Sequence, residues 1–176
     1  RRELLAWLGL SPAGLMLGGH AAATATADTG AKPIGTGDLG VVVERARGAL
    51  ALVNTSTRRV LAEIGGLGDL SHASVVFARD GAVAYVFGRD GGLSKVNLLT
   101  RQIEARVMQA GNSIGGAISA DGTLVAAQNY TPGGIKVFDA VTLVQVADLP
   151  ARDEQGRLSR VGGLADLPGR RFIYSL

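Results

Sequence analysis

The sequence contains no cysteine among its 176 residues. Within these residues there is therefore no disulfide bond, thiolate zinc site, iron–sulfur cluster, cysteine nucleophile or lipid-modified cysteine. The C-x-x-C-H motif that attaches a c-type heme is missing for the same reason. Any metal or redox chemistry of these residues must come from other side chains or from a cofactor that is bound without thiolates.

Aromatic residues are also scarce, at 5% of the chain, and the excess of basic over acidic residues is only +3. The lysines and arginines are scattered, with no basic run and few aromatics between them. Nucleic-acid readers concentrate positive charge on one face and stack bases on aromatic rings. The composition therefore argues against a nucleic-acid partner.

The N-terminus has the pattern of an export signal. Arg1 and Arg2 precede the apolar stretch Leu4–Leu17, and a small-residue segment, Ala21–Ala27, follows. This order predicts a secretory signal over residues 1–27, and the paired arginines are typical of a twin-arginine signal. The apolar stretch is shorter than the ~20 residues of a membrane-spanning helix. We therefore expect a periplasmic protein without a membrane anchor in the mature chain; the general secretory route and a buried amphipathic helix are the alternatives.

After a predicted linker over residues 28–38, short apolar runs alternate with turn residues, which is typical of an all-β chain. No later stretch keeps helical periodicity for long. The predicted strands are Val41–Val43, Leu50–Asn54, Arg59–Ile64, Val75–Phe77, Ala82–Phe87, Leu93–Asn97, Ile103–Val107, Gly116–Ser119, Leu124–Ala127, Ile135–Phe138 and Val144–Ala147.

These strands repeat along the chain. Asp80-Gly81 recurs 41 residues later as Asp121-Gly122, and Asn54, Asn97 and Asp139 follow one another at spacings of 43 and 42 residues. Asp-Gly pairs favour tight hairpin turns, and an Asn or Asp before a Thr-containing turn bonds its own backbone. Four strands per ~40–45 residues is the size of a propeller blade. Residues 39–176 are therefore predicted to form about three and a half blades of a β-propeller, with a β-sandwich as the alternative.

Two generic motifs carry little weight. Gly35–Gly40 matches G-x-G-x-x-G, but that fingerprint needs a strand before it and a helix after it, and here a linker precedes and a β-run follows. A Ser-His-Asp set can be written around His72 from Ser71 or Ser74 and Asp69 or Asp90. Residues so close in sequence rarely have triad geometry, and no nucleophile elbow is present.

His72, Arg89 and Arg160 are better candidates for a functional site. His72 is the only histidine after the predicted signal, and it stands just before a strand. An imidazole can ligate iron, and arginine forks bind carboxylates, so the set suits an iron tetrapyrrole that carries acidic groups. The structural alternative for the histidine is a satisfied residue at a loop–strand junction. For the arginines the alternatives are solvation at the surface and a structural ion pair, with Arg89 and Asp90 as the obvious candidates.

Two glycine-containing loops complete the candidate site. Gly111–Gly116 contains Asn112, and Asn129–Gly134 contains Tyr130. They are expected at matching ends of one blade, where they offer amides, a hydroxyl and an aromatic ring. Glycines let a flat macrocycle approach the backbone closely, although they also serve in tight connections.

Three phrases carry a family resemblance: Gly68–Phe77, Ala84–Leu93 and Gln109–Ile118. With Asn129–Pro132 and Ser159–Val161, they resemble the NirF family of heme d1 biosynthesis and the related d1 domain of cytochrome cd1 nitrite reductase. The similarity covers residues 39–176. It implies an eight-bladed propeller in the full-length protein, with heme d1 or a heme d1 precursor held in the centre.

Residue by residue, the resemblance implies that His72 is the iron ligand, with Arg89 near the carboxylates of the macrocycle. It further implies that Tyr130 and Arg160 belong to the pocket. Asn112 stands where the nitrite reductase has an arginine, which favours binding of a precursor or a different task. Arg106 is a further candidate partner for acetate and propionate groups.

The function implied is periplasmic work in heme d1 biosynthesis, and hence in denitrification: binding a late heme d1 precursor and taking part in the oxidative tailoring of a side chain. Heme d1 assembly proteins and cytochrome cd1 nitrite reductase are the partners that this implies. A non-catalytic heme d1 carrier and a propeller scaffold without a cofactor are the alternatives, so whether the protein is an enzyme stays open.

Overall fold

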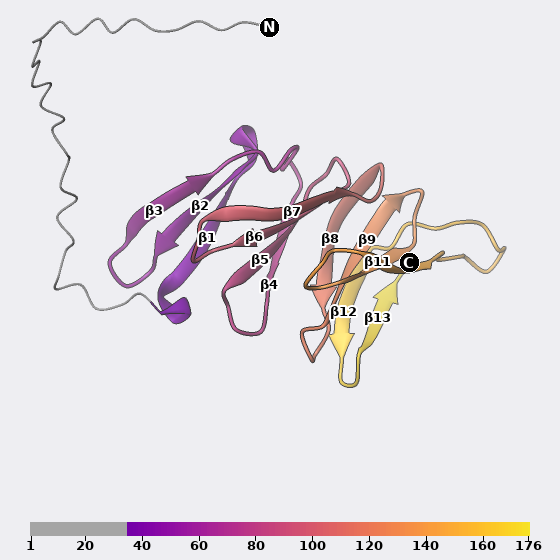
Figure 1. The fold of residues 1–176 in the computed structure, drawn as a ribbon. Coiled ribbons are helices and arrows are strands. Elements are labelled where there is room, and N and C mark those ends of the chain that lie inside the picture. The colour runs from indigo at the N-terminus through magenta and orange to yellow at the C-terminus, as the bar shows by residue number, and fades with distance from the viewer. Residues whose placement is uncertain (1–34) are drawn as a thin grey trace, which may run out of the picture. The chain divides into compact units, whose positions relative to one another are not determined.

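The computed structural model describes residues 35–176, so the predicted signal (1–27) and most of the predicted linker (28–38) lie outside the described residues. Two short 3-10 helices, η1 (Thr36–Asp38) and η2 (Arg45–Arg47), accompany a chain of strands (Figure 1). The strands are β1 (Leu39–Glu44), β2 (Ala49–Asn54), β3 (Arg59–Ile64), β4 (Ser74–Phe77), β5 (Val83–Phe87), β6 (Gly92–Asn97), β7 (Gln102–Met108), β8 (Asn112–Ile118), β9 (Leu124–Thr131), β10 (Ile135–Asp139), β11 (Gln145–Leu149), β12 (Gly163–Leu167) and β13 (Arg171–Ser175).

Every sheet is an antiparallel meander of consecutive strands. β1–β3 form a three-stranded sheet, β4–β7 and β8–β11 each form a four-stranded sheet, and β12 pairs with β13. Figure 1 shows the four sheets following one another in chain order. The all-β prediction is confirmed, and the repeating unit of four strands is present twice in full.

The turns form as the repeat predicts. Gly81 and Gly122, the second residues of the two Asp-Gly pairs, have φ of +71° and +75°, a region that glycine enters at little cost. The Oδ1 atoms of Asn54, Asn97 and Asp139 accept hydrogen bonds from the backbone N–H groups of Thr57, Thr100 and Thr142, at 2.7, 2.9 and 2.8 Å. These side chains close equivalent turns in three successive blades.

Consecutive blades pack face to face, which explains the apolar runs of the middle strands. In β5, Ala84 and Val86 face the core shared with the first sheet, whereas Tyr85 and Phe87 face the core shared with β8–β11. Side chains on alternate positions of a strand point to opposite faces. A strand buried on both faces is therefore apolar at most positions, and the middle of a blade is such a strand.

The structure also extends the predicted elements. β8 begins at Asn112, four residues before the predicted strand, and its register against β9 is irregular at Asn112/Ser113 and Ser113/Gly115. β12 and β13 lie beyond the last strand that the pattern predicted. The Gly35–Gly40 motif runs through η1 into β1 rather than into an α-helix, so it lacks the context of a nucleotide fingerprint.

Candidate functional site

The five predicted site residues come from the same end of successive blades. β4 begins and β5 ends at the paired residues Ser74 and Phe87, and His72 and Arg89 lie just outside this pair. In the next blade Asn112, the first residue of β8, pairs with Thr131, the last residue of β9 and the neighbour of Tyr130. Arg160 lies before β12, which packs beside β8 as β4 does. The first strands of three blades are thus neighbours, and the candidate residues stand at their leading ends.

His72 lies in the exposed turn that precedes β4. The neighbouring residue Ser71 stabilises the turn, because its backbone N–H donates to Asp69 Oδ1 at 2.8 Å. Hydrogen bonds from the side chain and backbone of Ser71 lower the pKa of Asp69, with the charge of Arg89 as a smaller contribution. Among the described residues, no hydrogen bond joins the imidazole to a serine or an aspartate, which leaves the Ser-His-Asp alternative without support.

Arg89 is exposed. A hydrogen bond fixes its backbone, whereas its side chain faces solvent. Its N–H donates to the carbonyl of Asp69 at 2.8 Å, which fixes the β5–β6 turn against the loop that leads to His72. Within residues 35–176 the guanidinium has no ion pair and donates no hydrogen bond. An arginine without an internal partner at the mouth of a site can bind a ligand carboxylate through two parallel hydrogen bonds.

Of the two structural alternatives for this arginine, solvation at the surface agrees with its exposure, whereas an ion pair between Arg89 and Asp90 is wrong. Asp90 pairs instead with Arg106 of β7, whose Nη2 lies 2.7 Å from Asp90 Oδ2. Burial opposes ionisation of Asp90, but hydrogen bonds from Arg106 and from the N–H groups of Gly92 and Asp69 outweigh it and lower its pKa. Adjacent side chains in a tight turn diverge, whereas the neighbouring strand brings Arg106 to the carboxylate. Arg106, which the sequence suggested as a partner for acetate groups of a ligand, thus already has an ion-pair partner in Asp90.

Tyr130 and Arg160 meet across two blades. The Arg160 guanidinium carbon lies 5.6 Å from the centre of the Tyr130 ring, within the range of a cation–π contact. Both side chains are exposed. Arginine can stack on an aromatic face and still donate hydrogen bonds from its edge. The pair therefore offers a flat apolar surface beside a cation.

The backbone explains why these two residues meet. The N–H of Val161 donates to the carbonyl of Asn129 at 3.2 Å, and the N–H of Gly134 donates to the carbonyl of Ser159. A Cβ at Gly133 would collide with that Ser159 carbonyl, so the segment before β12 approaches the β9–β10 turn only because glycine stands there.

Beneath Tyr130 lies a buried amide pair that the sequence pattern did not reveal. The side chains of Gln109 and Asn129 exchange two hydrogen bonds of 2.9 Å, and Lys136 donates to the Gln109 carbonyl at 2.6 Å. Asn129 is completely buried. Buried polar groups that are fully paired specify one arrangement of the chain, and here they fix the end of β9. Its only sequence signal was the polar run Gln128–Asn129 inside an otherwise apolar strand.

Asn112 stands at the irregular start of β8. Its Oδ1 atom and the Oγ atom of Ser74 at the start of β4 are both buried without a hydrogen-bond partner among the described residues. Gly115 packs directly against Ser74, since a Cβ there would lie 2.7 Å from the hydroxyl. Bulges of this kind re-aim side chains near functional sites.

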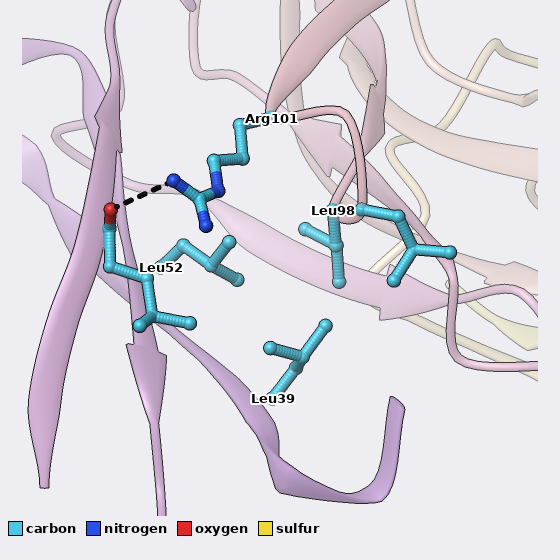
Figure 2. Close-up of a pocket in the computed structure, with 6 residues that line it drawn as sticks. Leu39, Leu52, Leu98 and Arg101 are labelled. Atoms are coloured by element: carbon cyan, nitrogen blue, oxygen red, sulfur yellow. Dashed lines mark hydrogen bonds between the residues drawn. The ribbon is translucent and has the colours of Figure 1, made fainter. Parts of the chain in front are cut away.

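One partly open pocket lies elsewhere in the described part of the chain. A pocket of about 130 Å³ between the first two sheets is lined by Leu39, Leu52, Leu61, Leu98, Leu99 and Arg101 (Figure 2). Arg101 closes it by donating to the Leu61 carbonyl at 3.4 Å. The pocket lies at the end of β6 opposite Arg89, and pockets for drug-sized ligands measure roughly 300–1,000 Å³. It is too small for a tetrapyrrole and contains none of the predicted site residues.

Among residues 35–176 no group of three or more His, Asp or Glu side chains could hold a metal ion. Of the five predicted site residues, His72 is the one whose side chain is a common ligand of heme iron. In the same part of the chain, no helix has the length and apolar character needed to cross a membrane.

Comparison with known proteins identifies the family of the chain. The family described as the cytochrome D1 heme domain matches residues 34–176. NirF from Stutzerimonas stutzeri is 65% identical over 144 residues, and NirF from Pseudomonas aeruginosa is 58% identical over the same length. Each alignment covers 81% of this chain and 37% of the relative, so the chain spans 37% of the length of these curated proteins.

The chain is also similar to dihydro-heme d1 dehydrogenase, both in sequence and in structure. Dihydro-heme d1 dehydrogenase from Pseudomonas aeruginosa is 35% identical over 106 residues, which is 60% of this chain and 22% of the enzyme. The solved structure of dihydro-heme d1 dehydrogenase NirN in complex with DHE superposes with a TM-score of 0.72 at 29% identity, covering 79% of this chain and 30% of that one.

Hydrazine synthase from Kuenenia stuttgartiensis superposes with a TM-score of 0.59 at 18% identity, covering 80% of this chain and 44% of that one, a likeness of fold alone. The propeller prediction is confirmed by the arrangement of the blades together with the match to the heme domain and to NirN. This chain belongs to the family of the cytochrome D1 heme domain and, within that family, is similar to NirF.

Proposed function

We propose that this chain forms part of the tetrapyrrole site of a periplasmic propeller that acts in heme d1 biosynthesis, where it binds a late heme d1 precursor. The observation that carries the proposal is the gathering of five residues of suitable chemistry at one end of neighbouring blades. The similarity to NirF and to dihydro-heme d1 dehydrogenase supports the ligand class. Heme d1 assembly proteins and cytochrome cd1 nitrite reductase remain the proposed partners.

The residues fit such a ligand in their donor set. His72 is exposed and offers an imidazole to iron, while Arg89 has no partner among the described residues and offers a fork to a carboxylate. Arg160 and Tyr130 offer a cation beside an aromatic face for the edge of the macrocycle. Asn112 contributes an amide whose oxygen has no hydrogen-bond partner within residues 35–176. When bound, the tetrapyrrole supplies the redox-active iron that none of these side chains provides.

Side-chain tailoring is the finer part of the proposal. The 35% identity to dihydro-heme d1 dehydrogenase favours an oxidation in which a peripheral side chain of the precursor loses two electrons to an external electron acceptor and two protons to solvent. The chain would orient the carboxylates through Arg89 and Arg160. A heme d1 carrier would use the same residues for binding and would leave the ligand unchanged.

The test is a titration of the full-length protein with heme d1 and with its dihydro precursor, followed in the visible spectrum. We expect a shifted Soret band that His72→Ala abolishes or displaces, while Thr57→Ala, in a turn at the other end of a blade, leaves it unchanged. Absence of binding to the wild-type protein would refute the proposal and leave a scaffold without a tetrapyrrole. Slow conversion of the bound precursor in the presence of an electron acceptor would identify an enzyme, and a constant spectrum would identify a carrier.

A further inference from the structure

Asp90 and Arg106 form a half-buried ion pair. The Asp90 carboxylate also joins two segments that each carry a candidate ligand-binding residue: the β5–β6 turn with Arg89 and the loop before β4 with His72. Asp90 Oδ2 accepts from Arg106 Nη2 at 2.7 Å and from the backbone N–H of Asp69 at 3.3 Å. Asp90 Oδ1 accepts the N–H of Gly92 at 2.9 Å. One carboxylate thus ties the β5–β6 turn, the outer strand β7 and the loop before β4 together.

The two segments are also joined through their backbones. The N–H of Arg89 donates to the carbonyl of Asp69, three residues before His72. Arg89 and Asp90, neighbours in one turn, therefore both bond Asp69, one through its main-chain N–H and one through its carboxylate. The distance between the His72 loop and the Arg89 turn depends on this short set of contacts.

Three glycines surround the ion pair. A Cβ at Gly68 would collide with both Asp90 and Arg106, and a Cβ at Gly92 would collide with the Arg106 guanidinium. A Cβ at Gly88 would lie 2.6 Å from Asp90 Oδ1. Real Cβ atoms do not approach so closely, so these positions leave room for the two charged side chains in this one arrangement. The pair is therefore built into the fold and is not a chance surface contact.

We propose that Asp90 and Arg106 are positioning residues, which hold the Arg89 turn against the His72 loop and leave the Arg89 guanidinium free for a carboxylate of the ligand. This inference rests on the proposed function for the identity of the ligand, but the positioning itself is a property of the free protein. Without Arg106, the Asp90 carboxylate would lose its ion-pair partner, and its contact with the Asp69 N–H would be less well fixed.

The first measurement needs no ligand. Hydrogen exchange of the Arg89 backbone N–H is compared in the wild-type protein, in Arg106→Gln and in Glu104→Gln. Glu104 lies on the same strand, β7, and pairs with Lys95 at 3.0 Å, so Glu104→Gln removes an ion pair of the same blade without touching Asp90. We expect exchange of the Arg89 N–H to rise at least 10-fold in Arg106→Gln only. Equal protection in the two variants would overturn the inference.

The second measurement asks whether Arg106 acts through Arg89. Affinity for heme d1 is measured for Arg106→Gln, for Arg89→Met and for the double variant. We expect each single variant to weaken binding about 10-fold, or about 1.4 kcal/mol, and the double variant to bind no worse than Arg89→Met. Multiplied effects in the double variant would show that Arg106 acts independently, which contradicts a positioning role.

Gly92→Ala is a second way to disturb the pair if Arg106→Gln does not fold. It displaces the guanidinium without removing a charge, and Gly92 has no positive φ that alanine would strain. It should reproduce the faster exchange at Arg89. Arg106→Lys should keep the protection of the Arg89 N–H only in part, because an ammonium lacks the planar fork. Absence of tetrapyrrole binding to the wild-type protein would refute the proposed function. The exchange result tests the positioning role of Asp90 and Arg106 separately.

Discussion

The guanidinium of Arg160 stacks over the ring of Tyr130 at 5.6 Å, although the two residues belong to different blades. Tyr130 stands near the end of β9, and Arg160 stands in the segment that leads into β12. The backbone bond from Val161 to Asn129 holds these segments together beside the pair. The contact places an aromatic face and a cation at the same end of the blades as His72 and Arg89.

Replacement of Arg160 by methionine should weaken tetrapyrrole binding more than it weakens the fold. An exposed cation–π contact contributes about 0.5–1 kcal/mol, so the free energy of unfolding should fall by no more than that. Affinity for heme d1 should fall about 10-fold because a charge-assisted hydrogen bond to a carboxylate is lost. Titration and thermal unfolding of Arg160→Met and Arg160→Lys measure the two effects, and equal affinities of wild type and Arg160→Met would exclude a binding role.

Arg89→Met should separate binding from stability even more clearly. Because the Arg89 guanidinium has no partner within the described residues, its loss should change the free energy of unfolding by less than about 0.5 kcal/mol. Affinity for the tetrapyrrole should fall about 10-fold or more. Arg59→Met is the matched control, since Arg59 is exposed at the start of β3, at the opposite end of its blade. A similar loss of affinity in both variants would point to a general effect of charge.

Gly116→Ala should destabilise the protein by at least about 2 kcal/mol, because a methyl group at this position has no room. A Cβ at Gly116 would collide with the Ala126 carbonyl of β9 and with the Phe87 ring, which ends the strand before Arg89. Gly162→Ala is the control, since nothing lies within 4 Å of a Cβ there. Chemical denaturation provides the comparison, and equal midpoints would show that the inner strands have space to relax.

Tyr85 should make the protein sensitive to alkali. Burial, together with the nearby carboxylates of Asp80, Glu104 and Asp139, raises the pKa of Tyr85 to about 12, and its hydroxyl donates to the Ala140 carbonyl at 2.7 Å. A folded-state pKa above the unfolded value near 10 gives stability that is present below pH 10 and is lost as the pH rises toward 12.

Tyr85→Phe tests this linkage. The variant should be less stable at neutral pH by about 1 kcal/mol, because the Ala140 carbonyl loses its partner. Its stability should then fall less steeply than that of the wild-type protein between pH 10 and 12. Denaturation curves at several pH values measure both effects, and parallel pH profiles would contradict the assignment to Tyr85.

Much of the architecture follows from local chemistry. Asp-Gly pairs, Asx turns and short apolar runs specify hairpins through the glycine φ preference and through side-chain to backbone bonds, and these act over a few residues. The strands from β1 to β7 accordingly lie within a few residues of their predicted bounds. The start of β8 was missed because its register is set by irregular pairing with β9 and has no local signature.

The sequence by itself determined the absence of thiol chemistry within these residues, the order of the strands and the repeat that makes successive blades alike, because each depends on residue types or on neighbours along the chain. The family resemblance also singled out His72, Arg89, Asn112, Tyr130 and Arg160 as candidates. Only the tertiary structure decided which charges pair. Asp90 bonds Arg106 and leaves Arg89 without a partner among the described residues, and Arg160 meets Tyr130, because sheet pairing and blade packing bring together side chains that are distant in sequence.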